Sequence, residues 1–229
     1  MGIFVFNINM KKITDIYDEY KIMPNLQLHQ MRVAAVAMQI CESIDLEIDT
    51  DNIVKACLLH DIGNIVKFDL NHFPEYNKPE GIEYWQKVKD DYISKYGEDE
   101  HVASYKIAQE LSLPEKILNL IVKTDPHIVL EIRDCNDLAE KICNYADQRV
   151  TPNEIVSVVE RNNEAKERYK NHPHAFDDEH SNFFLKNMRD IENQIFSHSN
   201  IKPEDINNQS ILFYLKNLKD FEFSTLNSN

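Results

Sequence analysis

Glycine is scarce in this chain, and the scarcity limits the folds open to it. Only four of the 229 residues are glycine: Gly2, Gly63, Gly81 and Gly97. An average composition of about 7% would supply roughly sixteen. No two of the four are close enough to form a GxGxxG turn or a GxxxxGK loop, which need clustered glycines to bring backbone N–H groups against phosphate. The sequence therefore excludes Rossmann and P-loop folds and disfavours a β-sandwich or barrel.

Helical periodicity dominates the remainder of the sequence. Apolar residues recur every three or four positions in successive segments, which predicts amphipathic helices. The expected spans are about 26–40, 49–60, 81–95, 99–111, 114–121, 138–150, 153–170, 182–196 and 209–220. Residues 68–80 and 171–180 hold prolines and lack periodicity, so we predict loops there, and residues 224–229 are expected to fray. We predict one all-α domain, a helical bundle over residues 1–229, with its core at about 26–150 and C-terminal helices at about 153–220.

The charge balance limits the partners. The chain has 25 Lys and Arg against 39 Asp and Glu, a net charge of −14. Duplex nucleic acid requires a basic face, so we predict no such partner. A small anionic substrate remains compatible, because a metal ion or a few local cations are enough to hold it. The oligomeric state stays open, a homodimer included.

Neither a membrane span nor an export signal is predicted. No apolar run approaches the roughly 20 residues of a transmembrane helix, and the apolar start of the chain is too short for a signal peptide. Cys41, Cys57, Cys135 and Cys143 form no CxxC pair and sit among apolar helical residues. They are typical of reduced, buried thiols. We therefore expect a cytoplasmic protein that has no membrane partner.

The most informative segment is an apolar helix that ends in His60 and Asp61. Adjacent side chains on a helix point about 100° apart, so this pair diverges as long as the helix continues. At a helix end, where Gly63 relaxes the backbone, both side chains can turn toward one point. An imidazole and a carboxylate that converge form a good site for a borderline or hard divalent metal.

Two further candidate ligands lie on other predicted helices. His29 shares an apolar face with Leu26 and Val33, and Asp147 lies beside Ala146 and Val150. A charged aspartate on an apolar face must be paired, hydrogen-bonded or bound to a metal. Two histidines and two aspartates would leave open positions in an octahedral shell for water and substrate.

Together these residues resemble the signature of the HD-domain phosphohydrolase superfamily, H…HD…D, carried here by His29, His60-Asp61 and Asp147. The gaps of 31 and 86 residues are ordinary for that superfamily. The flanking residues match as well, and the resemblance to the small, stand-alone bacterial members covers about residues 10–205. It implies an all-α bundle of the HD-domain type that binds a divalent metal through His29, His60, Asp61 and Asp147.

The resemblance also implies an activity. The usual reaction of the superfamily is hydrolysis of a phosphate ester or anhydride, often of a nucleotide, with the metal as Lewis acid and activator of water. The sequence does not distinguish Mn, Fe, Mg, Co, Ni or Zn as the native ion. Some members hold a second metal through additional histidines, for which His101 and His127 are candidates. Thr124 aligns better than His127 with the position of the second of these.

Further residues are candidates for substrate binding and proton transfer. Lys67 and Arg32 are close in sequence to the signature residues, and Arg149 follows Asp147 by two positions. Such cations suit a phosphate, because Arg offers bidentate contacts and Lys a point charge. Asn64 stands where many members have Lys and some have Glu; it can bind phosphate or water but cannot carry a proton. Asp61 or His101 is then the candidate catalytic base, and the general acid is unassigned.

Two other readings remain open. The neutral Asn64 is also consistent with a regulatory module that holds a metal and a nucleotide with little turnover. A di-iron oxygenase is a rarer chemistry on the same fold, and it requires two metals per chain.

Overall fold

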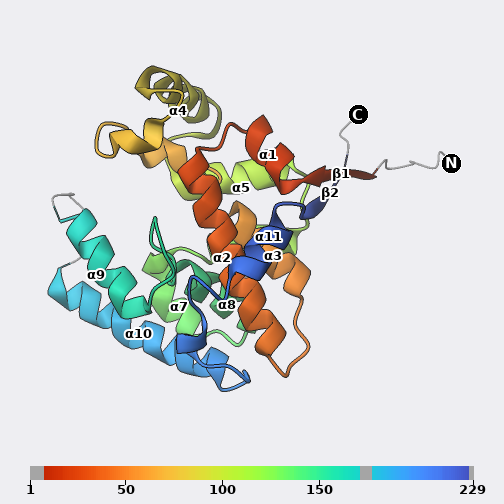
Figure 1. The fold of residues 1–229 in the computed structure, drawn as a ribbon, viewed down its shortest axis with the longest axis vertical. Coiled ribbons are helices and arrows are strands. Elements are labelled where there is room, and N and C mark those ends of the chain that lie inside the picture. Colours follow the sequence, from red (N-terminus) through yellow and green to blue (C-terminus); the bar gives the residue numbers. More distant parts are fainter. Residues whose placement is uncertain (1–7, 171–176, 227–229) are drawn as a thin grey trace.

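Most of the described chain, residues 8–170 and 177–226 of the computed structural model, is helical (Figure 1). The α-helices are α1 (Ile13–Glu19), α2 (Pro24–Ser43), α3 (Thr50–Leu59), α4 (Ile82–Tyr96), α5 (Glu100–Glu110), α6 (Glu115–Val122), α7 (Val129–Asp134), α8 (Leu138–Asp147), α9 (Val158–Arg168), α10 (Asp178–Phe196) and α11 (Leu212–Leu218). Short 3-10 helices are η1 (Asn64–Lys67), η2 (Pro74–Asn77), η3 (Pro126–Ile128) and η4 (Pro203–Asp205). The predicted helical fold class is confirmed.

The fold is centred on α2, α3 and α8, which pack against one another in the middle of the molecule (Figure 1). Pro24 occupies the first turn of α2, where its missing N–H costs nothing. Asp49 caps α3 by accepting a hydrogen bond from the backbone N of Asn52. The buried residues of α2 and α3 are nearly all apolar, so burial of these faces drives their association. Three cysteines, Cys41, Cys57 and Cys143, are free and buried in this core.

The remaining helices surround this centre. Helices α4 and α5 pack against η1 at the end of the molecule drawn at the top of Figure 1, and α9 and α10 lie at its lower left. α10 contacts both α7 and α8, and α11 covers α2. Among the described helices, none combines the length and the apolar composition needed to cross a bilayer.

Several local predictions were wrong. Residues 153–157 are not helical: Val150 and Ile155 form an isolated bridge, and α9 begins only after Ser157, whose side chain forms a capping box with Glu160. Residues 222–226 form strand β2 (Glu222–Leu226), which pairs antiparallel with β1 (Ile8–Lys12). The helices α1 and α7 were not predicted. Residues 171–176 of the predicted loop lie outside the described residues, as do 1–7 and 227–229.

Gly63 allows the turn after α3 to lie directly against α5. A Cβ atom at this position would stand 2.5 Å from the backbone N of Ser104 and 2.7 Å from the Cβ of Ala103. The Gly63 backbone N also donates to the Ser104 hydroxyl at 3.0 Å. Any side chain here would push α5 away from the turn that follows the His60-Asp61 pair.

Gly63→Ala is therefore expected to destabilise the protein by about 1–3 kcal/mol, the usual cost of overpacking. Urea unfolding measures this loss. Adding Ala103→Gly removes the clash with one side chain but leaves the clash with backbone, so it should restore only part of the stability. Wild-type stability in the single variant would contradict the close approach of these backbones.

Candidate metal centre

Four side chains from the three central helices converge on one point. His29 lies in the second turn of α2, His60 caps the C-terminus of α3, Asp61 follows it, and Asp147 is the last residue of α8. The predicted helix break at the His60-Asp61 pair is present, because α3 ends at Leu59. The exposed fractions of the side chains are 1% for His60, 14% for His29 and Asp147, and 23% for Asp61. The cluster therefore opens to solvent on the Asp61 side.

The spacing of the ligand atoms suits a metal ion. The Nε2 atoms of His29 and His60 each lie 3.6 Å from Asp61 Oδ2, and they lie 3.0 and 3.4 Å respectively from Asp147 Oδ1. Bonds of about 2.1 Å place neighbouring ligand atoms of an octahedral ion about 3.0 Å apart and opposite ones about 4.2 Å apart. All four distances fall in this interval. Within the described residues, the cluster of at least three metal-ligating side chains is His29, His60 and Asp61.

His60 is oriented for metal binding by the backbone. Its Nδ1 lies 2.8 Å from the carbonyl oxygen of Cys57, an acceptor, so Nδ1 carries the proton and donates it. This leaves the lone pair of Nε2 facing the carboxylates of Asp61 and Asp147. Nε2 is buried and has no hydrogen-bond partner among the described residues. A backbone carbonyl that fixes the imidazole in this tautomer is typical of metal-binding histidines.

The electrostatics of the cluster also favour a cation. Burial by itself lowers the pKa of His60, yet the adjacent carboxylates of Asp61 and Asp147 outweigh it and raise that pKa to about 10. Burial raises the pKa of Asp147, but the adjacent imidazoles of His29 and His60 hold it well below its usual range. The cluster thus attracts positive charge strongly, either as a proton or as a metal ion. The imidazole and carboxylate donors fit a borderline or hard divalent ion.

Ion pairs link a group of charged residues on η1, on α5 and just before η3. Lys67 Nζ donates to Glu100 Oε1 at 3.2 Å, and the Lys67 side chain is 40% exposed. Burial lowers the pKa of Lys67, but the charges of Asp61 and Glu100 raise it above its usual value. His101 Nε2 lies 3.8 Å from Glu100 and 3.8 Å from Asp125.

Glu100 and Asp125 were missed by the sequence reasoning. Glu100 immediately precedes His101, and this adjacency was the only available signal. Asp125 follows the buried Thr124 and caps η3 by accepting from the backbone N of His127. His127 itself is exposed. His101 Nε2 thus lies near two carboxylates, and the metal-ligand group found among the described residues includes neither His101 nor His127.

The predicted substrate residues fall in different places. Asn64 is buried at the start of η1, where its backbone N bonds to Asp61 O at 3.0 Å. Arg32 lies one turn after His29, is partly buried, and donates from Nη1 to the carbonyl of Pro152 at 2.8 Å. Burial lowers the pKa of Arg32. Arg32 thus bonds to the loop after α8, and the roles of Lys67, Arg32 and Asn64 in substrate binding stay predictions.

Arg149 corrects the sequence expectation. Its side chain is buried, and its guanidinium donates to the Tyr145 hydroxyl at 2.7 Å and to the carbonyls of Pro203 at 3.1 Å, Ile206 at 3.0 Å and Val156. These acceptors occupy the donors that a phosphate would need. Arg149 therefore joins the end of α8 to the C-terminal segment and does not contact substrate.

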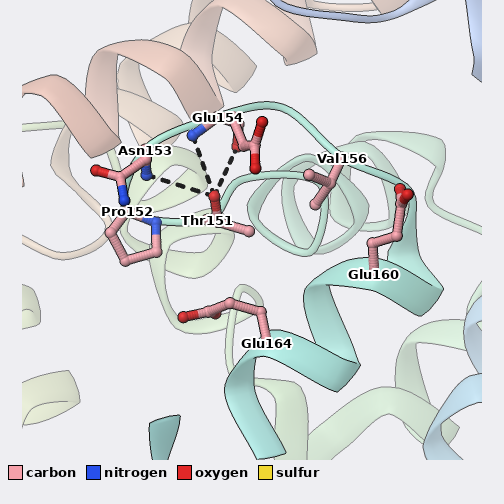
Figure 2. Close-up of a pocket in the computed structure, with 7 residues that line it drawn as sticks. All are labelled: Thr151, Pro152, Asn153, Glu154, Val156, Glu160 and Glu164. Atoms are coloured by element: carbon pink, nitrogen blue, oxygen red, sulfur yellow. Dashed lines mark hydrogen bonds between the residues drawn. The ribbon is translucent and has the colours of Figure 1, made fainter. Parts of the chain in front are cut away.

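A separate cavity lies beside the loop that follows α8 (Figure 2). Its volume is about 250 Å³, and it is lined by Thr151, Pro152, Asn153, Glu154, Val156, Glu160 and Glu164. Figure 2 shows this loop on one side and α9 on the other. A phosphate there would meet the carboxylates of three glutamates without a lining cation, and like charges repel. None of the four candidate ligands lines it, so it is not the phosphate site.

Comparison with known proteins agrees with this geometry. The family model of the HD domain matches residues 27–149, which is more than half of the chain and includes all four candidate ligands. No curated protein and no solved structure matches the chain. Because the match spans α2 through α8 and the signature residues converge in the structure, the chain belongs to the HD domain family.

Proposed function

We propose that this protein is a divalent-metal-dependent phosphohydrolase that acts on a small phosphorylated substrate of nucleotide type. The observation that carries the proposal is the convergence of His29, His60, Asp61 and Asp147, with contacts of 3.0–3.6 Å, in an HD domain. These four residues would hold the metal. The open side next to Asp61 leaves room for a substrate phosphate and water.

The residues around the metal site have distinct proposed roles. A bound divalent ion supplies Lewis acidity toward a phosphoryl oxygen and lowers the pKa of a coordinated water. Lys67, whose side chain is partly exposed, would supply a positive charge for the substrate phosphate, and Arg32 would supply a second one. Asn64 offers a neutral amide for hydrogen bonds to phosphate or water.

His101 is the proposed proton carrier. Its Nε2 lies 3.8 Å from the carboxylates of Glu100 and Asp125, and an imidazole in this position can pass a proton to the leaving group. Asp61, the most exposed of the four candidate ligands, is the proposed base. His101 would therefore transfer a proton without binding the metal itself.

A phosphatase screen tests the proposal. Metal-free protein is loaded separately with Mn²⁺, Mg²⁺, Co²⁺, Ni²⁺, Zn²⁺ or Fe²⁺ and assayed on nucleoside mono-, di- and triphosphates and on p-nitrophenyl phosphate. We expect metal-dependent release of phosphate, and its loss in Asp61→Asn. Tight retention of a nucleotide without hydrolysis would favour the regulatory module instead. Two metals per chain with oxygen-dependent turnover would favour a di-iron oxygenase.

A further inference from the structure

Gln30 is completely buried next to the first candidate ligand. It follows His29 on α2 and is 0% exposed. Consecutive helical side chains point about 100° apart, so Gln30 does not share the face of His29. Its position is in the contact layer between α2 and the end of α3, where most neighbouring buried side chains are apolar. An amide buried in such surroundings must find hydrogen-bond partners or carry a cost.

The amide of Gln30 reaches the backbone of the other signature segment. Its Oε1 accepts a hydrogen bond from the backbone N of Asp61 at 3.3 Å. In a continuing α-helix, that N–H would bond to the carbonyl of Cys57, four residues earlier. The Cys57 carbonyl instead accepts the Nδ1–H of His60 at 2.8 Å. The donor and the acceptor of the next helical hydrogen bond are thus both bonded to side chains instead of to each other.

This exchange explains how two adjacent side chains meet at one point. Because Gln30 takes the Asp61 N–H and His60 takes the Cys57 carbonyl, the α-helix ends at Leu59, and the chain continues as a turn in which Ile62 N bonds to Leu59 O. His60 and Asp61 then no longer diverge as on a helix. Their ligand atoms lie 3.6 Å apart.

We propose that Gln30 is a positioning residue that ends α3 through the Asp61 N–H and so holds Asp61 in place for the metal. The inference deepens the proposed function, because it concerns the same metal site. The orientation of the amide follows from its partner: a backbone N–H requires an oxygen acceptor, so Oε1 faces Asp61. The Nε2 atom points away from that N–H and is buried without a partner among the described residues. The contribution of this side chain to the site therefore comes from its Oε1 atom.

Hydrogen exchange of the Asp61 amide in the metal-free protein tests the contact directly. Gln30→Met keeps the length of the side chain but removes the oxygen, and Gln30→Asn shortens it by one methylene; both should speed exchange of this amide about tenfold. Gln30→Glu retains an oxygen at the same reach and should keep the exchange slow. Gln27→Met on the same helix, which removes only a bond to the carbonyl of Ile22, is the matched control. If the Asp61 amide exchanges at the same rate in wild type, Gln30→Met and Gln30→Asn, the proposal is overturned.

Metal affinity gives the second measurement. In a calorimetric titration with Mn²⁺, Gln30→Met should weaken binding about 10–100-fold, the usual effect of losing a residue that orients a ligand. Gln30→Glu should restore most of the affinity, and Gln27→Met should leave it unchanged. Wild-type affinity in Gln30→Met would contradict the positioning role.

The two failures are distinguishable. A wild-type protein that binds Mn²⁺ and hydrolyses nothing would defeat the proposed activity but leave the role of Gln30 to the titration. A wild-type protein that binds no metal would defeat the metal site, and Gln30 would then be a structural residue only. A slow Asp61 amide that does not depend on Gln30 would defeat the positioning role whatever the activity.

Discussion

Asp147→Asn is expected to remove the bound divalent metal and about 1000-fold of the hydrolytic rate. The carboxylate of Asp147 lies 3.0 Å from His29 Nε2 and 3.4 Å from His60 Nε2, and it supplies a negative charge to a buried cluster. Asparagine keeps the shape but not the charge. A metal that acts as Lewis acid contributes several kcal/mol to transition-state stabilisation, and each 1.4 kcal/mol is a factor of ten in rate. Loss of the ion therefore accounts for the expected decrease.

The matched control for this change is Asp137→Asn. Asp137 caps the N-terminus of the same helix, α8, by accepting from the backbone N of Ala139, and asparagine caps a helix about as well as aspartate. Metal content by elemental analysis and the hydrolysis rate are measured for both variants. Wild-type metal content in Asp147→Asn would show that this carboxylate is not a ligand.

Arg149→Met is expected to destabilise the protein by about 3–5 kcal/mol. The buried guanidinium of Arg149 donates hydrogen bonds to the hydroxyl of Tyr145 and to the carbonyls of Val156, Pro203 and Ile206. Its removal leaves several buried acceptors unsatisfied, and each such group costs about 1–3 kcal/mol. Arg149→Lys should lose much of this stability too, because an ammonium cannot span the four acceptors.

Urea unfolding measures this loss, with Arg189→Met, a change at an exposed arginine on α10, as the control. The sequence position of Arg149, two residues after Asp147, had suggested a phosphate ligand. A substrate ligand would behave differently: its variant would keep wild-type stability and show a raised KM. That result would contradict the structural role given to Arg149 here.

The candidate site could be predicted from the sequence because its residues are recognisable locally. His60 and Asp61 end an apolar helix, and His29 and Asp147 lie on apolar helical faces where a polar group requires a reason. The convergence of the four in space follows from the packing of α2, α3 and α8. The helices themselves were predictable because each buries one apolar face with a regular period.

Features that depend on distant partners could not be predicted. The acceptors of Arg149 at Pro203 and Ile206 lie more than 50 residues away in the sequence, and strands β1 and β2 pair across almost the whole chain. Gln30 looks like any polar residue of a helix until its contact with Asp61 is seen. The start of α9 was predicted too early. Ile155 is apolar and buried like a residue on the inner face of a helix, but it forms a bridge with Val150.

Anomalous diffraction from crystals of the metal-loaded protein tests the central claim most directly. We predict one divalent ion per chain, bound by His29, His60, Asp61 and Asp147, with the oxygen of Gln30 still on the Asp61 amide. A protein that binds no ion between these side chains, or binds its ion elsewhere, would contradict the account.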